Sequence, residues 1–266
     1  MYLTAIFLIG SIASIIGAIC GIGGGVIIKP VIDILGLTDV SSASFLSSCT
    51  VLMMTAYSVL KKPKDPHERK LDVKKVAPLA VGAACGGLIG KMSFEMIKDS
   101  LPFADEIGAY QAVVLGIAAS GTLIYTIRKE KIRTRHLDNP VISLLFGMAL
   151  GCMSSFLGIG GGPIDLVVLF YFFSMDTKTA AQNALFIIFI SQSFSISYTV
   201  FSGNVPAVSI AEVLIMSGGG IAGGIIGRKI NSKIDKKTVD KLFMTVLFII
   251  IIISVYNFYH YSGSAA

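Results

Sequence analysis

The sequence predicts an all-α polytopic membrane protein with two inverted repeats, each a re-entrant broken-helix hairpin plus three full transmembrane helices. Three observations support this fold class. Hydrophobic residues make up 54% of the 266 residues and charged residues only 14%, unlike a soluble domain. Eight apolar segments are long enough to enter or cross a hydrocarbon core about 30 Å thick. The pentapeptide Gly-Ile-Gly-Gly-Gly occurs at residues 21–25 and again at 158–162.

The two pentapeptides belong to a longer internal repeat whose copies lie 137 residues apart. The repeat divides the chain into units 1–136 and 137–266. Duplicated modules with interrupted helices are typical of secondary transporters. The other residues in register are Asp39 with Asp176, Ala43 with Ala180, Gly82 with Gly219, and Gly86, Gly87, Gly90, Lys91 with Gly223, Gly224, Gly227, Arg228. Among these, Gly86-xxx-Gly90 and Gly223-xxx-Gly227 are small-residue motifs through which membrane helices pack closely.

The first unit begins with the apolar segment 2–36, which the first glycine cluster interrupts. Glycine is a poor helix former, so a cluster of four in five residues predicts a break and a re-entrant hairpin. The segment lacks the positively charged start of a secretory signal peptide. Three unbroken spans are expected to follow it, at 43–60, 76–97 and 108–127.

The second unit repeats this order. Its re-entrant segment is 140–173, interrupted by the second glycine cluster. Proline directly after that cluster is a good first residue for the returning half-helix. The expected spans are 180–202, 206–227 and 242–260.

Loop charge predicts the orientation of these segments. Eighteen of the 22 basic residues lie in 61–75, 128–135 and 228–241, which the positive-inside rule assigns to the cytoplasm, close to anionic membrane lipid. This pattern explains the net charge of +6 without nucleic-acid binding. Two apolar segments separate the second basic loop from the uncharged, external loop 202–206. One of the two must therefore return to the side that it entered, and 140–173 is the candidate. The units are then inverted, and both termini are external.

Nothing in the sequence indicates an enzyme, a metal site or a cofactor. The four cysteines lie in or beside apolar segments, with neither disulfide nor zinc spacing. No Gly-Lys-Ser/Thr follows the first glycine cluster, which rules out a phosphate-binding loop. No Ser/His/Asp set or His-Glu-xx-His motif is present. We therefore expect no catalytic residues.

The glycine clusters are the strongest candidates for a binding site. Backbone that leaves a helix at membrane depth persists only where protein buries it or where it lines a wet cavity. The returning half-helices should begin at Val26 and Pro163, so that their free N–H groups form an anion cradle near the midplane. The carbonyl ends of the incoming arms offset part of this field. The expected contacts are Gly23, Gly24, Gly25, Val26, Gly160, Gly161 and Gly162.

Two ionisable residues, Lys29 and Asp165, lie within the returning arms. Charges inside a membrane span are costly and usually functional. Lys29 could bind the anion directly, pair with Asp165 across the two-fold axis, or extend its ammonium group to the headgroups. We expect Asp165 to be a carboxylate that couples transport to an ion.

Hydroxyl and amide side chains on the first span of each unit would complete the site. Such donors bind an oxyanion without a full counter-charge. Hydrogen bonding between helices is the alternative explanation for part of them. The candidate substrate ligands are Ser44, Ser47, Ser48, Asn183 and Gln192.

The paired glycine clusters and the paired Gly-Gly-xx-Gly-Lys/Arg motifs resemble those of the sulfite exporter TauE/SafE family over essentially the whole chain. The resemblance implies a multi-pass transporter of the prokaryotic cytoplasmic membrane for small sulfur-containing anions: sulfite, sulfoacetate or related organosulfonates. Family members differ in substrate. The expected mechanism is ion-coupled alternating access with the small anion, and with protons as candidate coupling ions. An anion channel on the same scaffold is the alternative.

Overall fold

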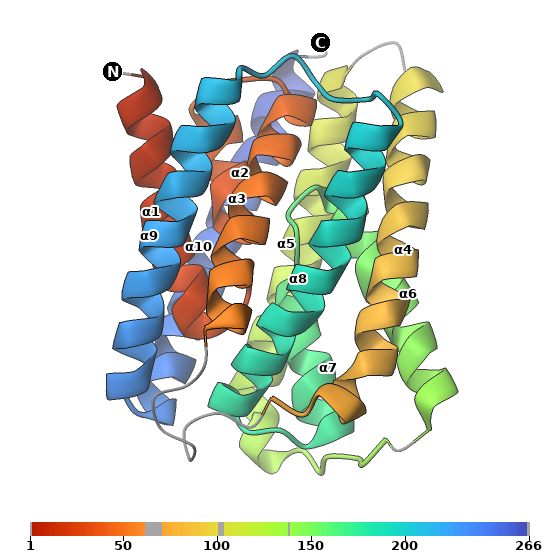
Figure 1. Cartoon of the computed structure of the whole chain (residues 1–266), viewed down its shortest axis with the longest axis vertical. Coiled ribbons are helices and arrows are strands. Elements are labelled where there is room, and N and C mark those ends of the chain that lie inside the picture. Colours follow the sequence, from red (N-terminus) through yellow and green to blue (C-terminus); the bar gives the residue numbers. More distant parts are fainter. Residues whose placement is uncertain (1, 62–70, 101–103, 138, 265–266) are drawn as a thin grey trace.

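The computed structural model describes residues 2–61, 71–100, 104–137 and 139–264, and every regular element among them is helical. Eight of the described helices are long and apolar enough to cross a membrane, which confirms the all-α polytopic fold class. Figure 1 shows the helices side by side along one long axis, with both termini at one end. The helices are α1 (Tyr2–Cys20), α2 (Gly25–Ile34), α3 (Val40–Leu60), α4 (Val73–Ser100), α5 (Ala104–Arg128), α6 (Pro140–Leu157), α7 (Pro163–Phe173), α8 (Thr177–Phe201), α9 (Ile210–Lys233) and α10 (Lys236–Ser264), with a 3-10 turn η1 (Lys129–Lys131) after α5.

Several helices extend beyond the apolar segments that predicted them. The predicted span 206–227 is the helix Ile210–Lys233, because Ser209 and Glu212 form a capping box that starts it after Pro206. Its last turns are polar and continue because Arg and Lys are good helix formers. The predicted span 242–260 likewise lies within α10. Hydropathy therefore located the helices and missed their polar ends.

Two aspartates that the repeat places in register have the same structural role. Asp39 precedes α3, and its carboxylate accepts the backbone N–H of Ser42 at 2.8 Å. Asp176 precedes α8, and its carboxylate accepts the N–H groups of Lys178 and Thr179. Both are N-caps, which satisfy N–H groups that have no acceptor within the helix. The sequence repeat thus fixes the start of the first long helix after each hairpin.

Each glycine cluster turns the chain between two antiparallel helices. Gly21 and Gly23 in the first turn, and Gly158 and Gly160 in the second, have positive φ angles between 65° and 80°, which glycine adopts without steric cost. The second hairpin returns to the end from which it started. Leu137, just before α6, donates its N–H to the carbonyl of Phe172 near the end of α7. The chain therefore turns back at both glycine clusters, as expected. The incoming arms α1 and α6 are themselves long and apolar enough to cross a membrane, so the re-entrant character of the hairpins and their inversion both stay predictions.

The spatial grouping of the helices differs from their grouping in sequence. Helix α1 packs mainly against α9, and α6 packs mainly against α4. One group contains α1, α2, α3 and α9; the other contains α4, α6, α7 and α8 (Figure 1). Each group therefore takes its fourth member from the opposite repeat unit. Helices α5 and α10 pack against each other as a separate pair, at the back of the view.

The spacing of small residues that the two repeat units share explains this exchange of helices. A Cβ atom on Gly86 of α4 would lie 2.0 Å from the carbonyl oxygen of Met148 of α6. A Cβ atom on Gly223 of α9 would lie 2.3 Å from the carbonyl oxygen of Ser11 of α1. Only glycine permits such an approach of two backbones. The packing role predicted for both motifs is thus what the structure shows.

Candidate functional site

The two glycine turns meet at the centre of the molecule. A Cβ atom on Gly25 would lie 1.8 Å from the carbonyl oxygen of Ile159 and 2.9 Å from the hydroxyl of Ser47. The turns come from different groups of helices, so this contact joins the groups. Gly25, Ile159 and Ser47 are all buried. The structure therefore brings the predicted glycine contacts of both units together.

Helices α3 and α8 cover both turns. Val51 of α3 and Ile188 of α8 lie within 3.3 and 3.4 Å of the position that a Cβ on Gly23 would take. Gln192 of α8 packs against Gly160. Its carboxamide carbon is 3.1 Å from the position that a Cβ on Gly160 would take. The walls of the site thus combine apolar side chains with one amide.

The first glycine turn presents N–H groups that no backbone acceptor uses. Ile27 and Ile28 both donate to the carbonyl of Gly24 at 3.0 Å. The four N–H groups before them, Gly23–Val26, form no backbone hydrogen bond in the described chain. No acidic residue lies in the first turn of α2. Because the N-terminus of a helix carries partial positive charge, this end is open to an anion.

Buried hydroxyl and amide groups beside the turns also lack partners. Ser14 and Ser47 are fully buried, and neither hydroxyl has a hydrogen-bond partner among the described residues. Ser14 is 3.1 Å from the Cβ position of Gly24. The side-chain oxygen of Gln192 is also without a partner. Unsatisfied buried polar groups are rare and call for an explanation, and a ligand supplies one.

The second glycine turn differs from the first, because an acid occupies its helix N-terminus. The carboxylate of Asp165 accepts the N–H of Gly162 at 3.1 Å, and the N–H of Asp165 donates to the Gly162 carbonyl at 3.2 Å. The carboxylate supplies one half of a capping box, because Gly162 has no side chain and its backbone carbonyl accepts the return bond. Asp165 is 4% exposed. In this conformation its carboxylate caps the N-terminus of α7.

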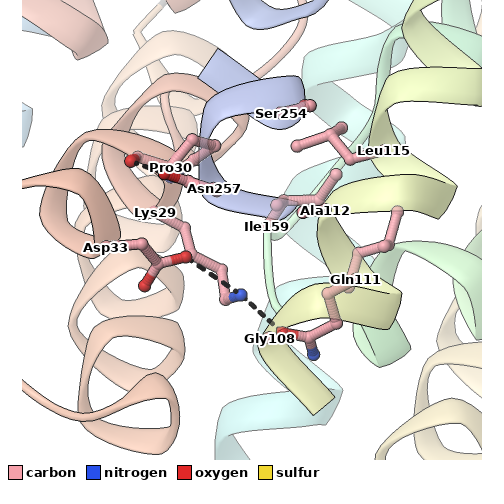
Figure 2. A pocket seen from close by; sticks show the side chains of 11 residues that line it. Lys29, Pro30, Asp33, Gly108, Gln111, Ala112, Leu115, Ile159, Ser254 and Asn257 are labelled. Carbon is pink, nitrogen blue, oxygen red and sulfur yellow. Dashed lines mark hydrogen bonds and ion pairs between the residues drawn. The ribbon is translucent and has the colours of Figure 1, made fainter. Parts of the chain in front are cut away.

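Lys29 is buried and pairs with a carboxylate on its own helix. Its ammonium nitrogen lies 3.5 Å from Asp33 Oδ2 and 2.5 Å from Gln111 Oε1 (Figure 2). Of the three alternatives for Lys29, extension to the headgroups is wrong, because the residue is only 3% exposed. Its ion-pair partner is Asp33, so the expected alternative of a pair with Asp165 is not what forms. The Gln111 amide in turn donates to the carbonyl of Phe156 at 2.6 Å.

Three predicted side chains have other environments. Ser44 lies against Gly158, but its hydroxyl donates to the carbonyl of Val40 in its own helix. Asn183 accepts the N–H of Asp72 and donates to the carbonyl of Thr179, near the start of α8. Ser48 is half-buried, and none of its atoms is among those nearest to the Cβ positions of the glycines in either turn.

Sequence reasoning missed Asp33, Gln111 and Ser14. Lys29 and Asp33 are four residues apart, the spacing at which side chains meet on one face of a helix, so that pair could have been found. Gln111 lies 82 residues beyond Lys29, and nothing in the sequence links the two. Ser14 is one of three Ser and Thr residues in an apolar helix, and such residues usually bond to their own backbone.

Comparison with known proteins adds independent findings. The family model described as sulfite exporter TauE/SafE matches residues 6–253. A protein of Haemophilus influenzae named "Probable membrane transporter protein" is 26% identical over 164 residues, which cover 58% of each chain. The "Probable membrane transporter protein YunE" of Bacillus subtilis is 25% identical over 224 residues, covering 77% of this chain and 81% of that protein. No solved structure matches the chain.

Proposed function

The chain belongs to the sulfite exporter TauE/SafE family, and from this premise we propose that it is a secondary transporter of small sulfur-containing anions. Sulfite, sulfoacetate and related organosulfonates are the candidate substrates. The observation that carries the proposal is the meeting of the two glycine turns, where helix N–H groups and buried hydroxyls have no hydrogen-bond partners in the part of the chain that the structure describes. The site lies in the cytoplasmic membrane of a prokaryote.

The chemistry of the site favours an oxyanion over a cation or a neutral solute. The first turn supplies the N–H groups of Gly23–Val26, and the hydroxyls of Ser14 and Ser47 add two further donors. A sulfonate or sulfite carries several oxygens that each accept hydrogen bonds, and charge-assisted bonds of this kind are the strong ones. The second turn, Gly160–Gly162, would close over the same ligand, with Gln192 beside it.

The arrangement of the helices supports alternating access. Each glycine turn belongs to a different group of helices, and the ligand would lie between them. Broken helices that meet at a central site, in two related modules, are the common design of carriers in which the modules move relative to each other. Figure 1 shows the contact between the groups, where α3 and α8 lie side by side at the centre.

Ion coupling is part of the proposal. Asp33 and Asp165 are the two buried carboxylates in the described chain, 8% and 4% exposed. Ionisable groups at membrane depth commonly carry protons in transporters. We propose that anion transport is coupled to proton movement through one of these two residues.

Transport by the purified chain in proteoliposomes tests the function. Labelled sulfite, sulfoacetate and taurine would be offered with and without a proton gradient. We expect saturable uptake of at least one anion and exchange of internal for external label, which a carrier performs. Unitary current steps without exchange would instead indicate the channel. No uptake of any of the three would contradict the substrate class.

Two glycine variants link transport to the site. Gly24→Leu and Gly161→Leu insert side chains into the two turns, and both should abolish uptake. Gly218→Leu is the matched control, because nothing lies within 4 Å of a Cβ at Gly218 of α9. Normal uptake by both turn variants would show that the anion binds elsewhere.

A further inference from the structure

We infer that Asp33 is the site that binds the coupling proton, and that its protonation frees Lys29 to bind the transported anion. This inference rests on the proposed function and adds to it the residue and the order of events. It follows from the surroundings of one buried ion pair.

Lys29 lies where the two helix groups meet the α5–α10 pair. It lies on α2, while its partner Gln111 lies on α5, and Gln111 is tied to the carbonyl of Phe156 at the end of α6. The aliphatic part of Lys29 also touches the second glycine turn: its Cε is 3.4 Å from the Cβ position of Gly158. A cation at this place is in reach of an anion bound between the turns.

A small cavity of about 10 Å³ borders Lys29 and Asp33 (Figure 2). That volume is close to what one water molecule needs. Its walls come from α2, α5, α10 and the segment around Gly158, with Leu157 and Ile159 on the side of the glycine turn. A single water there would give a proton a place between the ion pair and the anion site.

Asp33 has one oxygen that nothing in the described chain occupies. Oδ2 faces Lys29, whereas Oδ1 is buried without a hydrogen-bond partner. The hydroxyl of Ser254, which also lines the cavity, has no partner either. Both side chains are more than nine-tenths buried. A proton on Oδ1 would turn that oxygen into a donor for a water in the cavity.

The neighbours of Asp33 make it sensitive to the charge of Lys29. Lys29, on the same helix, faces the carboxyl group of Asp33. The phenol of Tyr261 on α10 also interacts with that carboxyl group. The other polar groups around the pair are amides: Gln111 on α5, and Asn257 on α10, which donates to the carbonyl of Pro30. No further acid or base faces the pair in the described residues. One cation and one carboxylate thus balance each other.

This balance makes proton and anion binding cooperative. While Asp33 is ionised, Lys29 is neutralised, and an arriving anion would meet a like charge in a medium of low dielectric. When Asp33 is protonated, the charge of Lys29 is uncompensated, and an anion restores neutrality. By linkage, the anion must raise the affinity for the proton by the same factor as the proton raises the affinity for the anion. Asp165 is not placed to couple proton binding to anion binding in this way, because its carboxylate caps α7.

The test measures binding of sulfoacetate at about pH 6 and about pH 8, a range in which unperturbed carboxylates and sulfonates keep their charge. The wild-type chain should bind up to about tenfold more tightly for each unit by which the pH falls, the limit for one linked proton. Asp33→Asn mimics the protonated state. It should bind at both pH values with the wild-type affinity of the acidic condition, exchange label normally and no longer accumulate anion along a proton gradient.

Asp165→Asn is the matched control and should keep the pH dependence of the wild type. A pH-dependent affinity in Asp33→Asn, or its loss in Asp165→Asn alone, would overturn the inference. Because Asp33→Asn could fail to fold, proton uptake on addition of sulfoacetate to wild-type protein in weak buffer is a second readout. We expect about one proton per anion by linkage. Transport without proton uptake overturns the inference alone; no binding or transport of any sulfur anion overturns the proposed function as well.

Discussion

Gly25 lies directly against the carbonyl oxygen of Ile159, 1.8 Å from where a Cβ atom of residue 25 would be. Two residues 134 positions apart in sequence therefore touch through their backbones at the centre of the molecule. This contact fixes the spacing of the two glycine turns, and so the size of the space that a ligand between them can use.

The first prediction concerns this contact. Gly25→Ala places a methyl group on the Ile159 carbonyl, and backbone atoms cannot move aside as a flexible side chain could. Overpacking of this kind costs about 1–3 kcal/mol or more, so the thermal unfolding midpoint in detergent should fall and transport should be lost. Gly218→Ala, which meets open space, should change neither. Equal stability of the two variants would contradict the close contact.

The second prediction concerns the unpaired hydroxyls. Ser14→Ala and Ser47→Ala remove buried hydroxyls that have no hydrogen-bond partner among the described residues. Removing an unsatisfied buried group is neutral or stabilising, whereas a lost hydrogen bond to a charged ligand costs about 1.5–3 kcal/mol. We expect unchanged or higher thermal stability with roughly tenfold or greater loss of anion affinity. Ser93→Ala on α4, whose hydroxyl bonds to its own helix, should leave affinity unchanged. Loss of stability without loss of affinity would assign the serines a packing role.

The third prediction concerns the buried ion pair. Lys29→Met leaves the Asp33 carboxylate buried without its cation, and breaking one partner of a buried pair costs about 3–5 kcal/mol. The double variant Lys29→Met with Asp33→Leu removes both charges and should recover most of this stability, because an apolar pair of similar size is often as stable. Unfolding of the two single variants and the double variant gives the coupling energy. Additive effects would show that the charges do not interact.

The fourth prediction concerns the N-cap of α8. Partial burial raises the pKa of the Asp176 carboxyl, but hydrogen bonds from Thr179 and the ion pair with Lys236 outweigh it, so this pKa lies below its ordinary value. A carboxyl group whose pKa is lower in the folded than in the unfolded state stabilises the fold fully above the unfolded-state pKa of about 3.9. That stabilisation is lost as pH falls through the folded-state pKa. Asp176→Ala should therefore cost about 1 kcal/mol near neutral pH, a usual N-cap effect, and less in acid. A deficit that is the same at about pH 7 and about pH 3 would contradict an ionised cap.

A fifth prediction follows from the exchange of α4 and α9 between the repeat units. Residues 1–136 and 137–266, expressed separately, should each fail to give a folded membrane protein, because α1 and α6 then lack their main partners. Co-expression should allow the two halves to be purified together through a tag on one of them. A folded, monodisperse half on its own would contradict the exchange.

Local features of this fold could be predicted because their causes are local. Gly21–Gly25 breaks its helix through backbone freedom that the residues themselves carry, and Asp39 caps the next helix with its own side chain. Helix partners could not be predicted. Gly86 and Gly223 signal close packing in the sequence, but they do not specify Met148 and Ser11 as the surfaces they meet.

The same limit explains which site residues were found. The glycines that meet at the centre are marked by the repeat, and their position follows from it. Lys29 was singled out because charge is rare inside a span, yet its environment depends on Gln111, which only the packing of α5 against the rest brings near. Asn183 has the right chemistry for an anion and lies elsewhere, because its place along α8 puts it beside Asp72.

The packing of α1 against α9 has a consequence for the order in which the protein can be made. A ribosome releases α1 first and α9 almost last, so the first helix waits in the bilayer for its main partner until synthesis is nearly complete. Contacts so distant in sequence form slowly. During that wait the face of α1 that later meets the glycines of α9 has only lipid or a membrane insertase beside it. Early truncations of this chain should therefore be substrates for quality-control proteolysis even when every helix that they contain is intact.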